Sequence, residues 1–142
     1  MKRMRQLLGI LALTSMLSAG LSGCGKYEEG PWMSFRSRTE RVANKWKIEK
    51  WTEKGVDQTA QALLLGLTWE FTDDGKATMT VSFMGKTESK TGTWAFANDD
   101  LEIDITMGGD KDSFTILKLK ESEFWIKSKD DKDESEIHFI PA

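Results

Sequence analysis

Apolar and polar residues alternate with a period of two from residue 45 to the end of the chain. In residues 76–83, alanine, methionine, valine and phenylalanine are separated by lysine, threonine and serine. Residues 101–107 repeat the pattern, with leucine, isoleucine and methionine at every second position. This period is typical of strands that have one buried face and one solvated face. We therefore expect an all-β domain.

Turn-forming segments separate the alternating runs. Asp73-Asp74-Gly75, Gly85-Lys86 and Gly108-Gly109-Asp110 contain residues that tolerate tight or left-handed backbone. Regular hairpin spacing favours an eight-stranded antiparallel meander, which can close into a barrel without free edges. A half-open barrel or a sandwich fits the same pattern. The strands are expected at residues 45–53, 62–72, 76–84, 88–97, 101–107, 113–120, 123–129 and 135–140.

Two local features modify this picture. Ser37 and Glu40 have the spacing of a capping box, which predicts a short helix ending near Asn44, before the first strand. Farther along, the apolar positions change parity between Ile116 and Leu117. Either a β-bulge lies near Ile116 or both faces of that strand are buried.

The first 24 residues follow a different pattern. Three cations precede an apolar stretch at residues 7–17, which is shorter than the roughly 20 residues that span a bilayer. Leu21-Ser22-Gly23-Cys24 then resembles the lipobox of bacterial lipoproteins. The resemblance implies a signal peptide at residues 1–23, and a diacylglycerol and an N-acyl chain on Cys24, the only cysteine. Residues 24–35 would form a tether and residues 36–142 the barrel domain.

Charge and the tether bear on location and partners. The leader contains three of the 20 basic residues and none of the 23 acidic residues, so the mature chain is distinctly acidic. This argues against nucleic acid as a partner. Lys26, Glu28 and Glu29 resemble the export signal of Bacteroidota surface lipoproteins, although they also suit a solvated tether. We expect a lipid anchor in the outer membrane. An export signal would expose the protein at the cell surface, whereas a plain tether leaves the leaflet open.

Several motifs of the mature chain resemble one family. Asn44-Lys45-Trp46 resembles the G-x-W signature of lipocalins, with asparagine in place of glycine. The stretches Trp69–Gly75 and Gly92–Phe96 are similar to the small lipocalin-like lipoproteins of Bacteroidota. The resemblance implies a lipocalin-like barrel. It says little about function, because folds of this kind carry many functions.

The strand alternation also suggests an apolar site inside the barrel. An eight-stranded barrel either holds one small ligand or is filled by its own side chains. We expect a non-catalytic protein that binds a small apolar molecule, and the alternative is a filled barrel that binds an envelope protein or an external macromolecule. The candidate pocket residues, which equally suit a plain core, are Trp46, Trp69, Met79, Phe83 and Trp94.

Catalytic and metal-binding motifs are poorly represented. His138, the only histidine, is expected on the outer face of the last strand, and no G-x-S-x-G or phosphate-binding loop occurs. The acidic residues of segment 130–134 could surround a calcium ion, but a solvated hairpin tip is the more typical interpretation. The sequence therefore predicts no enzyme activity, no cofactor beyond the lipid, and no metal.

Overall fold

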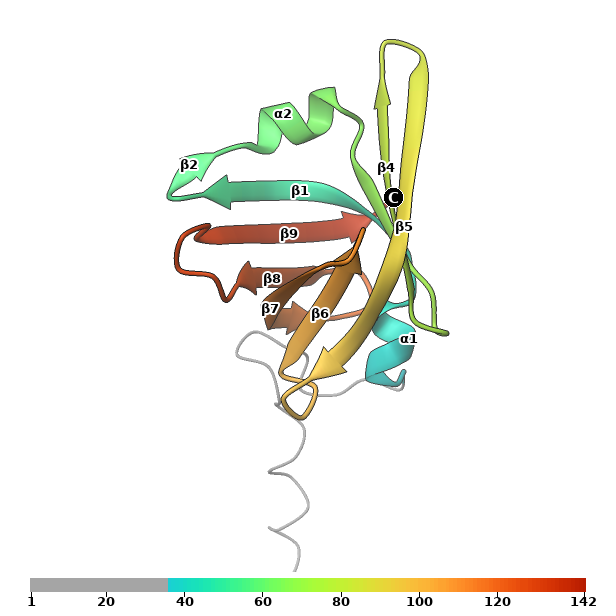
Figure 1. The fold of residues 1–142 in the computed structure, drawn as a ribbon, viewed down its shortest axis with the longest axis vertical. Coiled ribbons are helices and arrows are strands. Elements are labelled where there is room, and N and C mark those ends of the chain that lie inside the picture. Colours follow the sequence, from blue (N-terminus) through green and yellow to red (C-terminus); the bar gives the residue numbers. More distant parts are fainter. Residues whose placement is uncertain (1–35) are drawn as a thin grey trace, which may run out of the picture.

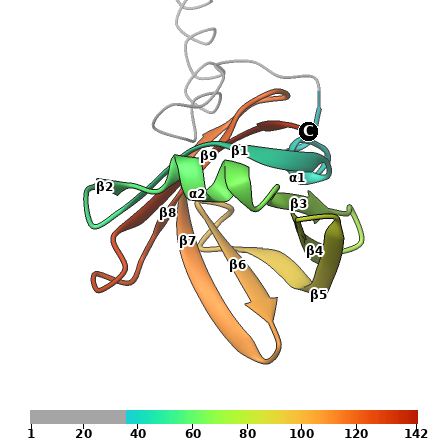
Figure 2. The same cartoon turned by 90° about the horizontal axis from the view of Figure 1, so that it is seen from above.

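The strands form one antiparallel sheet that closes on itself as a barrel (Figures 1 and 2). This computed structural model describes residues 36–142, and the predicted signal peptide, lipobox and tether lie outside the described residues. The two helices are α1 (Arg38–Val42) and α2 (Thr59–Leu64). The strands are β1 (Lys45–Glu53), β2 (Val56–Asp57), β3 (Thr68–Phe71), β4 (Lys76–Phe83), β5 (Lys86–Ala97), β6 (Glu102–Met107), β7 (Asp110–Leu119), β8 (Phe124–Ser128) and β9 (Ser135–Pro141).

Pairing between β1 and β9 closes the barrel. Their register runs from Trp46 opposite Pro141 to Glu53 opposite Ser135, while β1 also pairs with β3. Eight strands, β1 and β3–β9, follow one another around the barrel in sequence order. The two-residue strand β2 pairs with β1 outside this closed set. The predicted eight-stranded antiparallel meander, preceded by a short helix, is confirmed.

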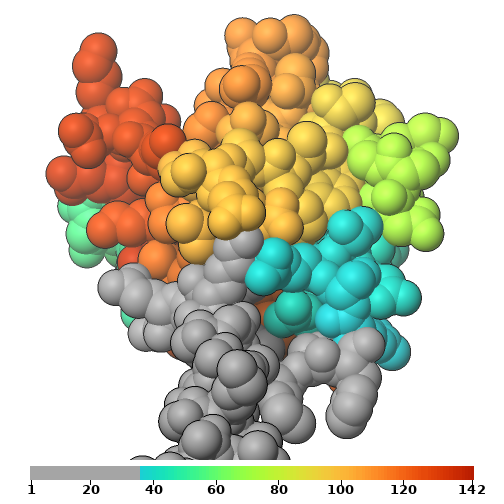
Figure 3. Space-filling view, turned by 90° about the horizontal axis from the view of Figure 1, so that it is seen from below, coloured from blue at the N-terminus to red at the C-terminus, as the bar shows by residue number. Residues whose placement is uncertain are grey.

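Helix α1 covers one end of the barrel. Its capping box is present: the Ser37 hydroxyl accepts from the backbone N–H of Glu40, and the Glu40 carboxylate accepts from that of Ser37 at 2.7 Å. Arg38 forms an ion pair of 3.0 Å with Asp100 in the turn between β5 and β6, and these segments lie side by side in Figure 3. We call this end, where Trp46 and Leu119 also lie, the closed end.

The expected strand at 62–72 is wrong over its first half. Residues 59–64 form α2, because alanine, glutamine and leucine all favour a helix when local propensity decides. Gly66, at φ 53°, ends the helix in the left-handed region. A side chain there would approach the carbonyl oxygen of Ser82 to 2.9 Å, so glycine permits the close approach to β4. Only β3 of the expected strand remains extended.

Two bulges set which residues face the interior. The register of β7 and β8 shifts between Ile116 and Lys118, which confirms the bulge near Ile116. A second shift, in β1 between Ile48 and Lys50, has no counterpart in the sequence analysis. It places Trp51 opposite Ile137, on the same inner face as Ile48. The inner face of β1 thus changes parity halfway along the strand.

Aromatic rings fill the interior near the closed end. Phe124 is at the centre of this packing, with its ring 5.7 Å from Trp46, 6.0 Å from Phe71 and 5.7 Å from Phe139. The largest fully buried side chains are Trp46, Phe71, Phe124, Phe139, Ile103, Leu119, Ile126 and Val42. This half of the barrel is therefore a packed aromatic and aliphatic core.

Candidate functional site

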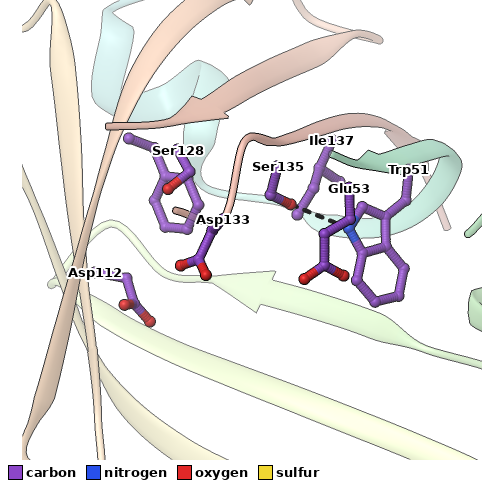
Figure 4. A pocket seen from close by; sticks show the side chains of 8 residues that line it. Trp51, Glu53, Asp112, Ser128, Asp133, Ser135 and Ile137 are labelled. Atoms are coloured by element: carbon purple, nitrogen blue, oxygen red, sulfur yellow. Dashed lines mark hydrogen bonds between the residues drawn. The ribbon is translucent and has the colours of Figure 1, made fainter. Parts of the chain in front are cut away.

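A cavity of about 250 Å³ lies at the opposite end of the barrel, which we call the open end (Figure 4). It lies where β1 and β8 finish and β9 begins. Its lining combines aromatic, hydroxyl and carboxylate side chains: Trp51, Glu53, Asp112, Phe114, Ser128, Asp133, Ser135 and Ile137.

The strand register shows that this lining belongs to the barrel interior. Directly opposed residues of an antiparallel pair project from the same face of the sheet. Asp112 is opposite the buried Ile105, and Phe114 is opposite the buried Ile103. Ile137 is opposite both Trp51 and the buried Ile126. The cavity is therefore a continuation of the core that the side chains do not fill.

Hydrogen bonds fix the Trp51 side chain and its strand. The indole Nε1 of Trp51 donates to the Ser135 hydroxyl at 3.0 Å, drawn as the dashed line in Figure 4. The Trp51 backbone N–H donates to the Thr59 hydroxyl at 3.0 Å, which links this position to the first residue of α2. The Trp51 side chain is therefore held in position at the cavity, and its indole nitrogen already has a hydrogen-bond partner.

Three carboxylates face the same cavity. Glu53 comes from β1, Asp112 from β7 and Asp133 from the loop between β8 and β9, and Figure 4 shows them directed toward a common space. No lysine or arginine is among the lining residues. Within residues 36–142, none of the three carboxylates has an ion-pair partner. The open end is thus an acidic site with aromatic walls.

The five predicted pocket residues are on the inner face but do not line this cavity. Trp46 and Trp94 belong to the packed half, where their indole nitrogens donate to the carbonyls of Val42 and Thr72, at 2.9 and 2.8 Å. Trp69 and Met79 are half-buried and opposed in the pairing of β3 with β4, and Phe83 is 41% exposed. As a ligand-contacting set, these five residues stay a prediction.

Exposed apolar side chains border the open end. A backbone hydrogen bond of 2.8 Å from Ser82 to Leu65 joins the end of α2 to the end of β4. Large hydrophobic side chains project into solvent from α2, β2 and the β4–β5 hairpin: Val56, Leu63, Leu64, Phe83 and Met84. Such a concentration of exposed apolar surface often marks a site of interaction.

A second depression, of about 490 Å³, is a surface groove. It lies at the closed end between the start of β1 and the turn after β3. Lys45 and Glu70, two of its lining residues, are opposed in the pairing of β1 with β3 and are both exposed. They alternate with the inward-facing Trp46 and Trp69, so this groove is outside the barrel, and its larger volume is open to solvent.

His138 lies on the outer face of β9, as predicted. Its Nε2 is 2.7 Å from the Glu136 carboxylate, and its ring stacks on Trp125 with centroids 3.8 Å apart. Lys118 is 4.0 Å from the Trp125 ring centre and forms an ion pair with Glu123. These contacts account for a packed outer face.

The described residues show neither a cluster of metal ligands nor a membrane-spanning helix. In residues 36–142, no group of three or more histidine, cysteine, aspartate or glutamate side chains is arranged to hold a metal ion. In segment 130–134, the Asp130 carboxylate accepts from the backbone N–H of Lys132 at 2.9 Å, as in a self-capped turn. Neither helix of the described chain is long and apolar enough to cross a membrane.

Comparison with known proteins agrees with the architecture. A closed meander of eight antiparallel strands, with a short helix at one end and a cavity at the other, defines a lipocalin-like barrel. Residues 42–126, more than half of the chain, match the family described as the lipocalin-like domain. The protein therefore belongs to the lipocalin-like domain family. No curated protein matches the chain.

Proposed function

We propose that the protein is a non-catalytic binding protein that holds one small molecule in the cavity at the open end of its barrel. The observation that carries the proposal is this cavity, whose lining includes Trp51, Phe114 and Ile137, three partly buried side chains that pack against the core. Its volume of about 250 Å³ is close to the lower end of the range usual for small-molecule sites. The ligand is therefore small.

The division of the interior supports this proposal over a wholly filled barrel. Aromatic side chains fill the closed half of the barrel, so a ligand in the cavity would contact a packed core. Trp51 is held by its bond to Ser135 before any ligand arrives. A site that is already ordered loses less conformational entropy on binding.

The proposal includes attachment to the outer membrane through lipid on Cys24. The tether of residues 24–35 can span at most about 40 Å when extended. It joins the barrel domain just before α1, at the closed end. Anchoring at the closed end would leave the open end accessible to the solution from which a ligand is captured.

The second candidate function is binding of another envelope protein or an external macromolecule. The specific observation in its favour is the exposed apolar rim, where Leu63 and Leu64 are 63% and 67% exposed and Met84 is 84% exposed. Burial of such side chains contributes about 25 cal/mol per Å². None of these exposed side chains lines the cavity, so the two candidate functions use different surfaces.

Native mass spectrometry of the protein extracted from its own membranes tests the first candidate. We expect a bound small molecule on the wild type and its loss from Phe114→Trp, which enlarges a side chain facing the cavity. Thr115→Trp, which adds an indole to the outer face of the same strand, is the matched control and should retain it. If the wild type carries no small molecule but co-purifies with one envelope protein, the second candidate replaces the first.

A further inference from the structure

We propose that the ligand is a small organic cation, with a protonated or quaternary amine joined to an apolar body. The inference rests on the proposed function and assigns the chemical class of molecule that the cavity selects. It differs from the apolar molecule expected from strand alternation alone, because three carboxylates share the lining with the aromatic rings.

The carboxylates come from three separate parts of the chain. Glu53 is opposite Ser135 in the pairing of β1 with β9, and Asp112 is opposite Ile105 in the pairing of β6 with β7. Asp133 reaches the cavity from the β8–β9 loop. Glu53 is half-buried, whereas Asp112 and Asp133 are exposed, so solvent at the open end keeps these carboxylates ionised.

Several carboxylates elsewhere in the described chain are paired with cations. Ion pairs of 2.9–3.4 Å join Arg38 to Asp100, Lys111 to Asp104, Lys118 to Glu123 and Lys129 to Glu102. The cavity carboxylates lack such a partner within residues 36–142. Lys86 and Lys90 also lie on the inner face, but they belong to β5, and no residue of β5 lines the cavity. A bound cation would be attracted by these carboxylates and would reduce the net negative charge of the site.

The aromatic walls suit an organic cation better than a bare metal ion. Trp51 and Phe114 line the same cavity, and an ammonium group near an aromatic face is attracted by the ring quadrupole, most strongly for tryptophan. Within the described residues, the three carboxylates do not converge closely enough to form a metal site. Apolar contact with Phe114 and Ile137 then requires a ligand with a hydrocarbon body.

Three probes of similar size and different charge test the inference. These are 2-phenylethylammonium, neutral 2-phenylethanol and the anion 3-phenylpropionate, titrated into the lipid-bearing protein in detergent by isothermal calorimetry. We expect the cation to bind about tenfold more tightly than the alcohol, and the anion more weakly still. The affinity for the cation should fall as the salt concentration increases, because salt screens the carboxylate charges at the open end. The Trp51 indole NMR signal, assigned with Trp51→Phe, should shift on binding.

Variants identify the groups responsible. Glu53→Gln and Asp112→Asn should each lower the cation affinity about fivefold without changing that of the alcohol. Glu88→Gln is the matched control, since Glu88 is on the inner face of β5 opposite Val81 and outside the lining. Equal affinities for the cation and alcohol, with Trp51 still shifting, would overturn the charge assignment and leave the proposed function standing. If no probe moves the Trp51 signal, the cavity itself is not the binding site.

Discussion

Trp46 illustrates how a single residue joins the closed end of the barrel to its core. The side chain is fully buried, its ring packs 5.7 Å from that of Phe124, and its indole nitrogen donates to the carbonyl of Val42 at 2.9 Å. The carbonyl is at the end of α1, whose last-turn carbonyls lack partners within the helix. One tryptophan therefore both fills the core and caps the preceding helix.

Replacement of Trp46 should lower the stability of the protein. We expect Trp46→Phe to lower the free energy of unfolding by about 2–3 kcal/mol, because it leaves a cavity and an unpaired Val42 carbonyl. Urea unfolding followed by far-UV circular dichroism measures the loss. The control is Trp69→Phe, at a half-buried position whose indole has no hydrogen bond to a described residue; its loss should be about 1 kcal/mol. Equal losses would contradict the capping role of Trp46.

The surroundings of Asp104 lead us to expect that the stability of the protein depends on pH through this one carboxyl. The Ser113 hydroxyl, at 2.7 Å, and then Lys111, at 3.4 Å, hold the pKa of this carboxyl below its ordinary value of 3.8. A depressed pKa in the folded state stabilises the protein above about pH 4, and this contribution disappears as pH falls through the folded value. Ser113→Ala should therefore reduce stability more at pH 7 than at pH 2.5.

Urea titrations of the wild type and Ser113→Ala at both pH values measure this difference. Ser89→Ala removes a hydroxyl that is bonded to Thr80, at 2.9 Å, and not to a carboxylate. Its effect should be the same at both pH values. A Ser113→Ala penalty that does not shrink in acid would show that Asp104 is not the linked group.

At the scale of elements, bulges and close approaches of the backbone decide which side chains meet. Gly92 in β5 lies against β6, where an added Cβ would be 1.8 Å from the carbonyl oxygen of Thr106 and 2.8 Å from the Met107 sulfur. The first of these atoms belongs to the backbone of a neighbouring strand. The long strand β5 can follow the barrel surface past β6 only with a residue that has no side chain.

Gly92→Ala should accordingly destabilise the barrel by about 3 kcal/mol or more, because β5 and β6 must separate. Thermal unfolding measures the effect, with Ala95→Gly, on an exposed position of the same strand, as the control for altered backbone freedom. The control should cost about 1 kcal/mol. A Gly92→Ala protein with wild-type stability would mean that the two strands are farther apart than described.

Sequence reasoning succeeded where alternation is regular and failed where an element breaks it. β4 and β6 keep one parity throughout and were predicted closely, whereas the leucine-rich start of segment 62–72 fits both strand and helix. Trp51 and Glu53 were missed because the β1 bulge changes their face, and no residue type marks that bulge. Parity identified the inner face of the barrel, but only packing shows which part of the interior is unfilled.

At the scale of the whole molecule, closure brings the two ends of the barrel domain together. The backbone N–H of Ala142 donates to the carbonyl of Lys45 at 2.9 Å, and Pro141 is opposite Trp46. Both ends of the domain therefore lie at the closed end, away from Glu53 and Ser135 at the cavity. This polarity connects the anchor proposal with the binding proposal, since anchoring at the closed end leaves the open end accessible.

Cys24 provides the test of the proposed lipid anchor. Cys24→Ser should abolish incorporation of a radioactive fatty acid, because Cys24 is the only thiol available for acylation. The barrel is independent of that thiol, so the variant should keep its ligand affinity and unfolding temperature. Label that persists on the variant would refute acylation at this residue.

The leaflet that holds the anchor is tested by proteolysis of intact cells. If Lys26, Glu28 and Glu29 act as a surface export signal, added protease should remove the protein from whole cells while a periplasmic marker survives. The variant Glu28→Ala/Glu29→Ala should then become protected, although it keeps its lipid and its barrel. Protection of the wild type in whole cells and digestion after permeabilisation would place the open end in the periplasm. The site would then select its cation from molecules that have already crossed the outer membrane.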